Sequence, residues 1–148
     1  MEDNIKKETI RRLINQSKLA VLSTVTLENI SESAVVEISA RDNLELIFDT
    51  LPTFRKYKNL NNNQNVSVVI GWEPATIQYE GIATELTGDV LEEYKQIHFM
   101  KFPEAVKFEK LGIKFFKIIP RWIRYTDVSR QPWEVFEVEF PVSSVRSV

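Results

Sequence analysis

Short segments rich in β-branched and aromatic residues recur along the chain between turn residues, and this pattern most constrains the fold. The segments LAVLSTV (19–25), VSVVIGW (66–72) and IKFFKIIPRWIRY (113–125) have the composition and length of strands. Further strands are expected over residues 34–39, 44–49 and 76–86. Many short strands joined by turns predict a mainly β domain that closes into a small antiparallel barrel.

Helices are expected to flank these strands. Apolar residues at helical spacing predict a covering helix over residues 4–15. A short helix is expected to begin at Pro52 and to end in the Asn-rich tract 61–65, because proline is favoured in a first helical turn. Asp89 followed by Glu92 resembles a capping box and predicts a third helix, with another short helix behind it.

The 148 residues, of which 43% are hydrophobic, suit one domain with one continuous core. We expect a covering helix (1–17), a barrel with inserted helices (18–126) and a C-terminal tail (127–148). Within the barrel, Gly81 is expected to form a bulge or bend, and Pro120 requires an edge strand or a bulge.

Charge and hydropathy exclude several classes of partner. The chain has 19 Lys and Arg against 21 Asp and Glu, so its net charge of −2 predicts no nucleic-acid partner. No apolar run approaches the roughly 18 residues of a membrane span, which predicts no membrane partner. The first residues, MEDNIKKETIRRL, lack the apolar centre of a signal peptide. We therefore expect a cytoplasmic protein.

The residues available for catalysis are few. The chain has no cysteine, which excludes disulfides, thiolate catalysis and the usual zinc sites. Its single histidine, His98, is expected on the surface of the third helix and cannot by itself make a histidine-rich metal site. We expect any chemistry to come from a bound cofactor.

A basic cluster stands near the start of the second predicted helix, in the sequence Thr53-Phe54-Arg55-Lys56 followed by Lys58. Cations in a first helical turn oppose the macrodipole, each at a cost on the order of 0.3–1 kcal/mol. A bound anion reverses that effect, because backbone N–H groups, an arginine and a lysine together make a phosphate clamp. The alternative is a solvated basic face that binds nothing.

The segments IFDTLPTFRKYKNLNNNQNVSVVIGW (47–72) and TIQYEGIATELTG (76–88) resemble the central signature of the pyridoxamine-phosphate oxidase-like FMN-binding split barrels. In that family a Ser-Arg-Lys loop leads to a helix, an Asn-rich turn, a strand often ending in Trp and a strand with a Gly. Here the Arg-Lys pair, the Asn tract, Trp72 and Gly81 follow in that order. The resemblance implies a six-stranded antiparallel split β-barrel of Greek-key type with FMN as cofactor.

The resemblance also implies which residues contact FMN. The basic pair would hold the phosphate, a threonine hydroxyl at the end of the preceding strand would help, and the second strand would run along the isoalloxazine. The implied cofactor-binding residues are Val35, Val36, Glu37, Thr50, Arg55, Lys56 and Thr76. No catalytic residue and no metal ligand is implied, since the flavin carries the chemistry.

Assembly and substrate class follow from the same resemblance. Small general-stress-protein-like members of the family are homodimers with flavin sites at the subunit interface, and the aromatic segment 113–125 offers apolar surface for pairing. The resemblance implies a small-molecule redox substrate. Vitamin B6 is not expected to be that substrate, because only Arg130-Gln131-Pro132-Trp133 faintly matches the C-terminal substrate motif.

A second interpretation stays open. Phe54 stands where the family usually has Ser, and Asp49-Thr50 suggests a one-residue insertion before the clamp. Both departures favour a split-barrel binding module without FMN catalysis, which would hold haem, a deazaflavin, a nucleotide or a protein partner. In the haem case, His98 is a candidate ligand.

Overall fold

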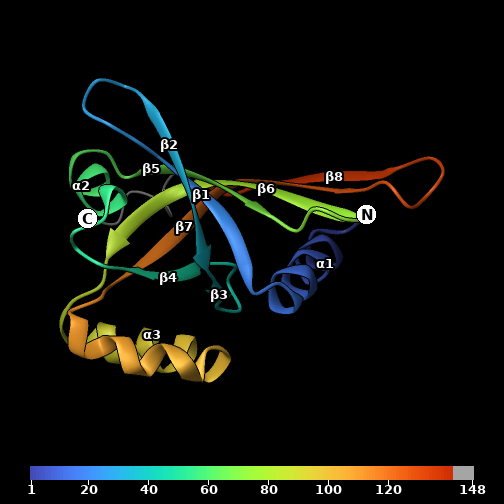
Figure 1. Cartoon of the computed structure of the whole chain (residues 1–148). Coiled ribbons are helices and arrows are strands. Elements are labelled where there is room, and N and C mark those ends of the chain that lie inside the picture. The colour runs from blue at the N-terminus through green and yellow to red at the C-terminus, as the bar shows by residue number, and fades with distance from the viewer. Residues whose placement is uncertain (142–148) are drawn as a thin grey trace.

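Strands make up most of the regular structure of residues 1–141, which the computed structural model describes (Figure 1). The strands are β1 (Leu19–Val25), β2 (Ser31–Glu37), β3 (Ser39–Ala40), β4 (Leu46–Thr50), β5 (Asn65–Ile70), β6 (Ala75–Glu85), β7 (Lys114–Asp127) and β8 (Glu134–Glu139). The helices are α1 (Asp3–Gln16), α2 (Arg55–Asn62), α3 (Gly88–Lys101) and the 3₁₀ helix η1 (Pro103–Leu111). Every segment predicted as a strand contains one.

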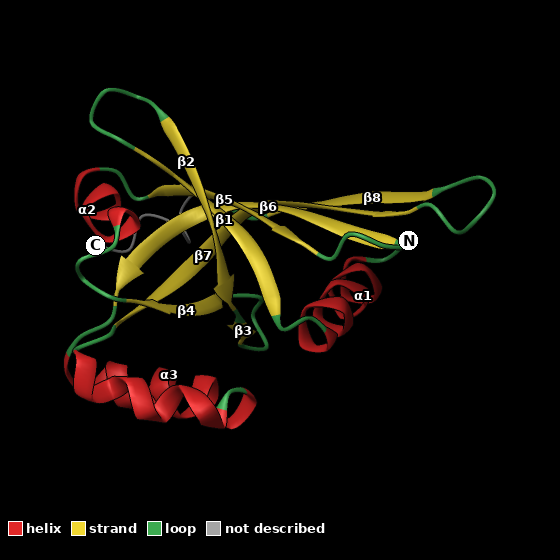
Figure 2. Cartoon of the chain, in the orientation of Figure 1, coloured by secondary structure: helices red, strands yellow, loops and turns green. Residues whose placement is uncertain are grey.

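The strands form one antiparallel sheet in the order β2-β1-β5-β6-β7-β4-β3, and β8 pairs with β7 outside this path. Figure 2 shows how the sheet curls, with α1 and α3 below it and α2 beside one end. The expected mainly β split-barrel fold is confirmed. None of the helices within residues 1–141 is long and apolar enough to cross a membrane.

The core fills the inside of the curl. Phe48 of β4 and Phe116 of β7 are buried and stack with their ring centroids 5.2 Å apart. Tyr79 of β6 is fully buried, and its hydroxyl lies 2.8 Å from the carbonyl oxygen of Leu44 and 3.0 Å from that of Ile118. The one polar atom of this large side chain is therefore satisfied inside the core.

A bulge interrupts the long pairing of β6 with β7. The register shifts between Glu80 and Gly81, and Gly81 lies opposite Pro120. A Cβ atom on Gly81 would lie 2.3 Å from the carbonyl oxygen of Ile119, so only glycine fits there. The bulge predicted at Gly81 is confirmed, and Pro120 lies opposite it, between the part of β7 that pairs with β4 and the part that pairs with β8.

Strand β8 was missed by the sequence analysis, which expected residues 127–148 to form a tail. Its sequence EVFEVE is half glutamate and half Val or Phe, so its strand formers are interrupted by charged residues. Pairing with β7 orders it, since Phe136 and Val138 point inward and Phe136 stacks on Tyr125 with centroids 4.9 Å apart. Residues 142–148 of the expected tail lie outside the described residues.

The presence of β8 changes the place of β7 in the sheet. Strand β7 pairs with β6, β4 and β8, so the interpretation of this segment as the last strand is wrong. Its aromatic residues Phe115, Phe116 and Tyr125 are buried within the chain. The aromatic surface expected for pairing with a second copy is therefore used mostly in the chain's own core.

Two helix starts differ from those predicted. Helix α2 begins at Arg55 rather than Pro52, after a turn over residues 52–54. The capping box of Asp89 and Glu92 is not formed, because Thr87 is the N-cap residue of α3 and makes no side-chain cap hydrogen bond. Helix α1 likewise begins without a side-chain cap. None of α1, α2 and α3 thus begins with a side-chain cap hydrogen bond, and only α2 follows a turn.

Candidate functional site

The connection from β4 to α2 places two cations at a helix N-terminus. Phe54 is the extended N-cap residue, and Arg55 and Lys56 are the first two residues of the helix, with no acidic residue in that turn. The first backbone N–H groups of a helix have no partner within it. Asn59 and Leu60 are buried and fix the helix against the sheet. The local arrangement predicted for a phosphate clamp is present, except that the helix begins later.

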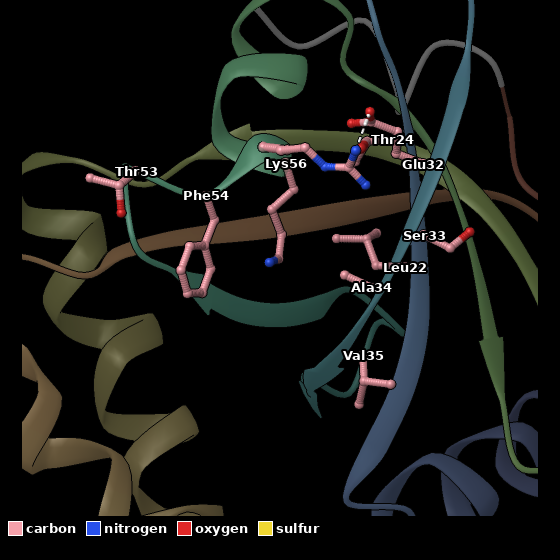
Figure 3. Close-up of a pocket in the computed structure, with 10 residues that line it drawn as sticks. Leu22, Thr24, Glu32, Ser33, Ala34, Val35, Thr53, Phe54 and Lys56 are labelled. Carbon is pink, nitrogen blue, oxygen red and sulfur yellow. Dashed lines mark ion pairs between the residues drawn. The ribbon is translucent and has the colours of Figure 1, made fainter.

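A cleft of about 450 Å³ opens beside this helix start, and we call it the first cleft (Figure 3). Figure 3 shows Phe54 and Lys56 on one side and Ala34 and Val35 on strand β2 on the other. The lining residues are Leu22, Thr24, Glu32, Ser33, Ala34, Val35, Thr53, Phe54, Arg55 and Lys56. On the sheet side the walls are mixed, since Leu22, Ala34 and Val35 lie beside Thr24, Ser33 and Glu32, and on the α2 side they carry two cations.

A neighbouring cleft of about 330 Å³, which we call the second cleft, continues along β2 toward η1. It shares Val35, Phe54 and Lys56 with the first cleft. The remaining lining residues are Val36, Glu37, Asp49, Thr50, Leu51, Phe108, Leu111 and Ile113. A long ligand could therefore extend from the start of α2 along β2, with its charged end at the cations and an apolar part against the valines.

Six of the predicted cofactor-binding residues line these two clefts: Val35, Val36, Glu37, Thr50, Arg55 and Lys56. The hydroxyl of Thr50, however, donates a hydrogen bond to the carbonyl oxygen of Leu51 at 3.1 Å and is buried. Thr76 pairs with Thr126 near the start of β6 and is not among the residues that line either cleft. Within one chain, the fold brings the first six together and leaves Thr76 apart.

Glu32 of β2 is a functional candidate that the sequence analysis missed. Its Oε2 atom lies 2.8 Å from Arg55 Nη1, and its Oε1 atom accepts a hydrogen bond of 2.9 Å from Asn59 Nδ2. The same Asn59 nitrogen donates to Thr24 Oγ1 at 2.9 Å. The Glu32 side chain is 19% exposed and that of Arg55 is 75% exposed. A fixed carboxylate thus partly neutralises the accessible guanidinium.

Lys56 is the more enclosed of the two cations. Its Nζ atom lies 4.9 Å from the centre of the Phe54 ring. Burial lowers the pKa of Lys56 below that of an ordinary lysine, and the negative charge of Asp49 opposes this effect. Since Lys56 lines both clefts, an anion bound in either would replace some of the lost solvation.

His98 of α3 is fully buried, so the expectation of a surface side chain is wrong. The ring packs against Phe102 and Phe115, with centroids 5.1 Å and 6.0 Å away, because this face of α3 lies on the sheet. Its Nδ1 atom is 2.7 Å from Ser39 Oγ and its Nε2 atom is 3.3 Å from Asp49 Oδ2. Both nitrogens thus face protein groups, and the ring is closed to an external haem iron.

Comparison with known proteins finds a family and several solved structures that are similar to this chain. A family model described as pyridoxamine 5'-phosphate oxidase matches residues 7–127. A search of curated protein sequences finds no match. Three solved structures illustrate the fold at low sequence identity.

A haem-binding protein from Mycobacterium smegmatis is 15% identical with a TM-score of 0.78, and the match covers 90% of this chain and 57% of that protein. This chain therefore spans little more than half of that relative. A pyridoxamine 5'-phosphate oxidase-related, FMN-binding protein from Nostoc punctiforme is 9% identical with a TM-score of 0.67, and the match covers 95% of this chain and 98% of that protein. General Stress Protein 26 from Bacillus anthracis is 24% identical with a TM-score of 0.64, and the match covers 90% of this chain and 98% of that protein.

Proposed function

Because the chain belongs to the pyridoxamine 5'-phosphate oxidase family, we propose that it binds FMN and acts as an oxidoreductase on a small molecule. One observation carries the proposal: the first and second clefts meet at Lys56, and Arg55, the other cation that begins α2, lines the first cleft. A flavin mononucleotide has the matching shape, with a dianionic phosphate at one end and a flat, largely apolar ring at the other.

The first cleft would hold the phosphate. Arg55 can grip two phosphate oxygens, Lys56 adds a point charge, and the free N–H groups of the first turn of α2 point toward an anion. Glu32 would share Arg55 with the phosphate or release it, because their present ion pair is exposed on the arginine side. The residues present therefore fit a phosphate, although the carboxylate of Glu32 competes with it for Arg55.

The second cleft would hold the ring. Val35 and Val36 provide an apolar edge of β2, while Phe108 and Leu111 of η1 face them. These side chains would orient the ring and exclude water from it. Bound FMN would supply the redox chemistry, which no cluster of side chains needs to perform.

We propose further that the active form is a homodimer. Exposed apolar side chains lie on the outer face of β1, β2 and β5, including Leu19, Val35 and Val69. Val35 belongs to this face and to both clefts, so a second copy that covered the face would also close the clefts. Thr76 would then contact the flavin only of the other copy, because in its own chain it lies away from the clefts.

A binding module without FMN catalysis is the second candidate function. Two features of this chain favour it: Glu32 forms an ion pair with Arg55, and the half-exposed Phe54 directly precedes the two cations of the clamp. The similar haem-binding protein of Mycobacterium smegmatis provides a precedent for this fold with another ligand. A colourless protein that takes up no added FMN would favour this candidate over the flavoprotein.

The clamp is tested by comparing two flavins. Arg55→Ala should weaken FMN binding about tenfold to a hundredfold, since a charge-assisted hydrogen bond contributes roughly 1.5–3 kcal/mol. Riboflavin, which has no phosphate, should lose much less. Flavin fluorescence titration of the purified protein measures both affinities.

Lys58→Ala is the matched control, because Lys58 is an exposed cation of the same helix that does not line the first cleft. Its FMN affinity should stay close to that of the wild type. Unchanged FMN binding in both Arg55→Ala and Lys56→Ala would refute the clamp, whereas equal loss of FMN and riboflavin would indicate general damage.

A further inference from the structure

Three polar side chains form a row from the second cleft to the buried side of α3. Ser39 Oγ lies 2.7 Å from His98 Nδ1, and His98 Nε2 lies 3.3 Å from Asp49 Oδ2. Ser39 is 2% exposed and His98 is 0% exposed, whereas the Asp49 side chain is 24% exposed and lines the second cleft. The row therefore opens to a ligand only at its carboxylate end.

This order excludes the function that a Ser-His-Asp set first suggests. In a hydrolase the serine faces the substrate and the aspartate is buried behind the histidine. Here the serine is the innermost member, closed off at the junction of β2 and β3. The accessible group can accept a hydrogen bond or hold a positive charge, and it cannot act as the nucleophile of a triad.

The environment of His98 determines where its protons lie. Its Nε2 atom has no hydrogen-bond partner within the described residues, and Phe102 and Phe115 on either side offer none. A buried polar atom without a partner is costly, and the Asp49 carboxylate lies 3.3 Å from it. A carboxylate only accepts, so a proton on Nε2 would face Asp49, and Ser39 would then donate to Nδ1.

One carboxylate oxygen of Asp49, Oδ2, lies close to His98. The same side chain is partly exposed and lines the second cleft. The other charged residues that line this cleft are Glu37 of β2, which is exposed and has no such inner partner described, and Lys56 of α2, which only donates. Asp49 is thus the acceptor that this cleft holds in place.

We propose that Asp49 recognises an N–H group on the edge of the ring bound in the second cleft, and that His98 is the residue that positions it. The inference rests on the proposed function in taking that ring to be a flavin. It assigns a specificity-determining role to a residue on β4 and a positioning role to the only histidine of the chain. It also explains why a polar ring is buried among phenylalanines under α3.

Lumiflavin and 3-methyl-lumiflavin test the recognition directly. The oxidised ring carries one N–H group, which the methyl group removes, and neither compound has a phosphate, so the clamp on α2 does not contribute. Wild-type protein should bind lumiflavin about tenfold more tightly than its methylated form, the effect of one charge-assisted hydrogen bond. Asp49→Asn should reduce this ratio strongly, and the matched control Asp89→Asn, at an exposed carboxylate of α3 that lines neither cleft, should leave it unchanged.

Substitutions of His98 separate positioning from simple structural support. In His98→Gln the side-chain amide can still donate to Asp49, so the tenfold ratio should persist, whereas His98→Leu should abolish it. Nitrogen NMR of the ligand-free wild type provides a measurement that needs no variant, because the chain has one histidine and one pair of ring signals. It should show the proton on Nε2.

Two results would overturn the inference: equal binding of the two lumiflavins by wild-type protein, or a ring proton found on Nδ1 alone. If FMN binds and depends on Arg55 while the lumiflavin ratio is one, the inference fails and the proposed function stands. If no flavin binds at all, the proposed function fails and the recognition role of Asp49 fails with it.

Discussion

The charge that α2 offers to an anion depends on a single acidic side chain from β2. Glu32 is held by Asn59 and pairs with Arg55, so the first helical turn carries less free positive charge than its sequence indicates. The ion pair and a phosphate compete for the same guanidinium. At the residue scale, therefore, cofactor affinity is a balance between Glu32 and the ligand.

Glu32→Gln should strengthen FMN binding by about twofold to fivefold, because an exposed ion pair contributes ~0.2–1 kcal/mol. The amide oxygen of glutamine can still accept the hydrogen bond of Asn59, so the strand and helix stay joined. Riboflavin affinity should not change. Glu28→Gln, on the exposed β1–β2 turn, is the control, and an equal gain in that variant would point to a general charge effect.

The pH dependence of FMN binding should reveal the protonation of Lys56. Burial lowers the pKa of this lysine, so it loses its proton at a lower pH than an exposed lysine. Phosphate favours the protonated form, and FMN affinity should therefore fall as the pH rises through the lowered pKa of Lys56. Lys56→Arg should flatten the fall, since arginine stays charged. Titrations between pH 7 and 10.5 that show the same slope in both proteins would contradict this role.

At the scale of elements, the β6–β7 pairing is the longest contact between neighbouring strands and depends on its bulge. Gly81 and Pro120 lie opposite each other. The position of Gly81 has no room for a side chain, and Pro120 has no backbone N–H to donate to the neighbouring strand. The bend between them lets one continuous β7 pair with β6 and β4 over its first part and with β6 and β8 further on.

Gly81→Ala should lower the free energy of unfolding by roughly 3 kcal/mol, because the added Cβ meets the backbone oxygen of Ile119 at 2.3 Å and cannot rotate away. Gly88→Ala is the comparison: this glycine has a positive φ of 69° but open space around it, so its loss should be ~1 kcal/mol. Urea denaturation measures both. An equal loss in the two variants would show that the bulge tolerates a methyl group.

At the scale of the whole molecule, one side of the sheet is left with exposed apolar residues. Val35, Val21 and Val69 lie next to one another across β2, β1 and β5, and Val35 and Val69 are exposed. Exposed apolar surface of this kind is typical of an interface between proteins. Because Val35 also lines both clefts, assembly and ligand binding would be linked at this strand.

We predict a homodimer, so light scattering at micromolar concentration should give about twice the chain mass of 17.3 kDa. Val69→Glu should yield a monomer, because it places a charge in the centre of the proposed interface, and its FMN affinity should fall. Val135→Glu, at an exposed valine of β8, should leave the mass unchanged. A wild-type monomer that binds FMN tightly would refute the dimeric site.

The sequence by itself determined the features that depend on neighbouring residues. β-Branched composition and alternation located six strands, since each such segment needs only its own side chains to show which face is buried. The cations of Arg55 and Lys56 were identified as part of a first helical turn because the turn is formed by consecutive residues. The resemblance of segment 47–72 to one family rested on the same local order.

Only the tertiary structure decided which distant side chains meet. Glu32 reaches Arg55, and Asp49 reaches His98, through the packing of helices on strands far away in the chain, which no local pattern encodes. Strand β8 forms where β7 presents an edge for it, although half of its residues are glutamate. Burial follows the same rule: His98 lies between Tyr94 and Phe102 on one face of α3, and the contact of this face with the sheet removes the ring from water.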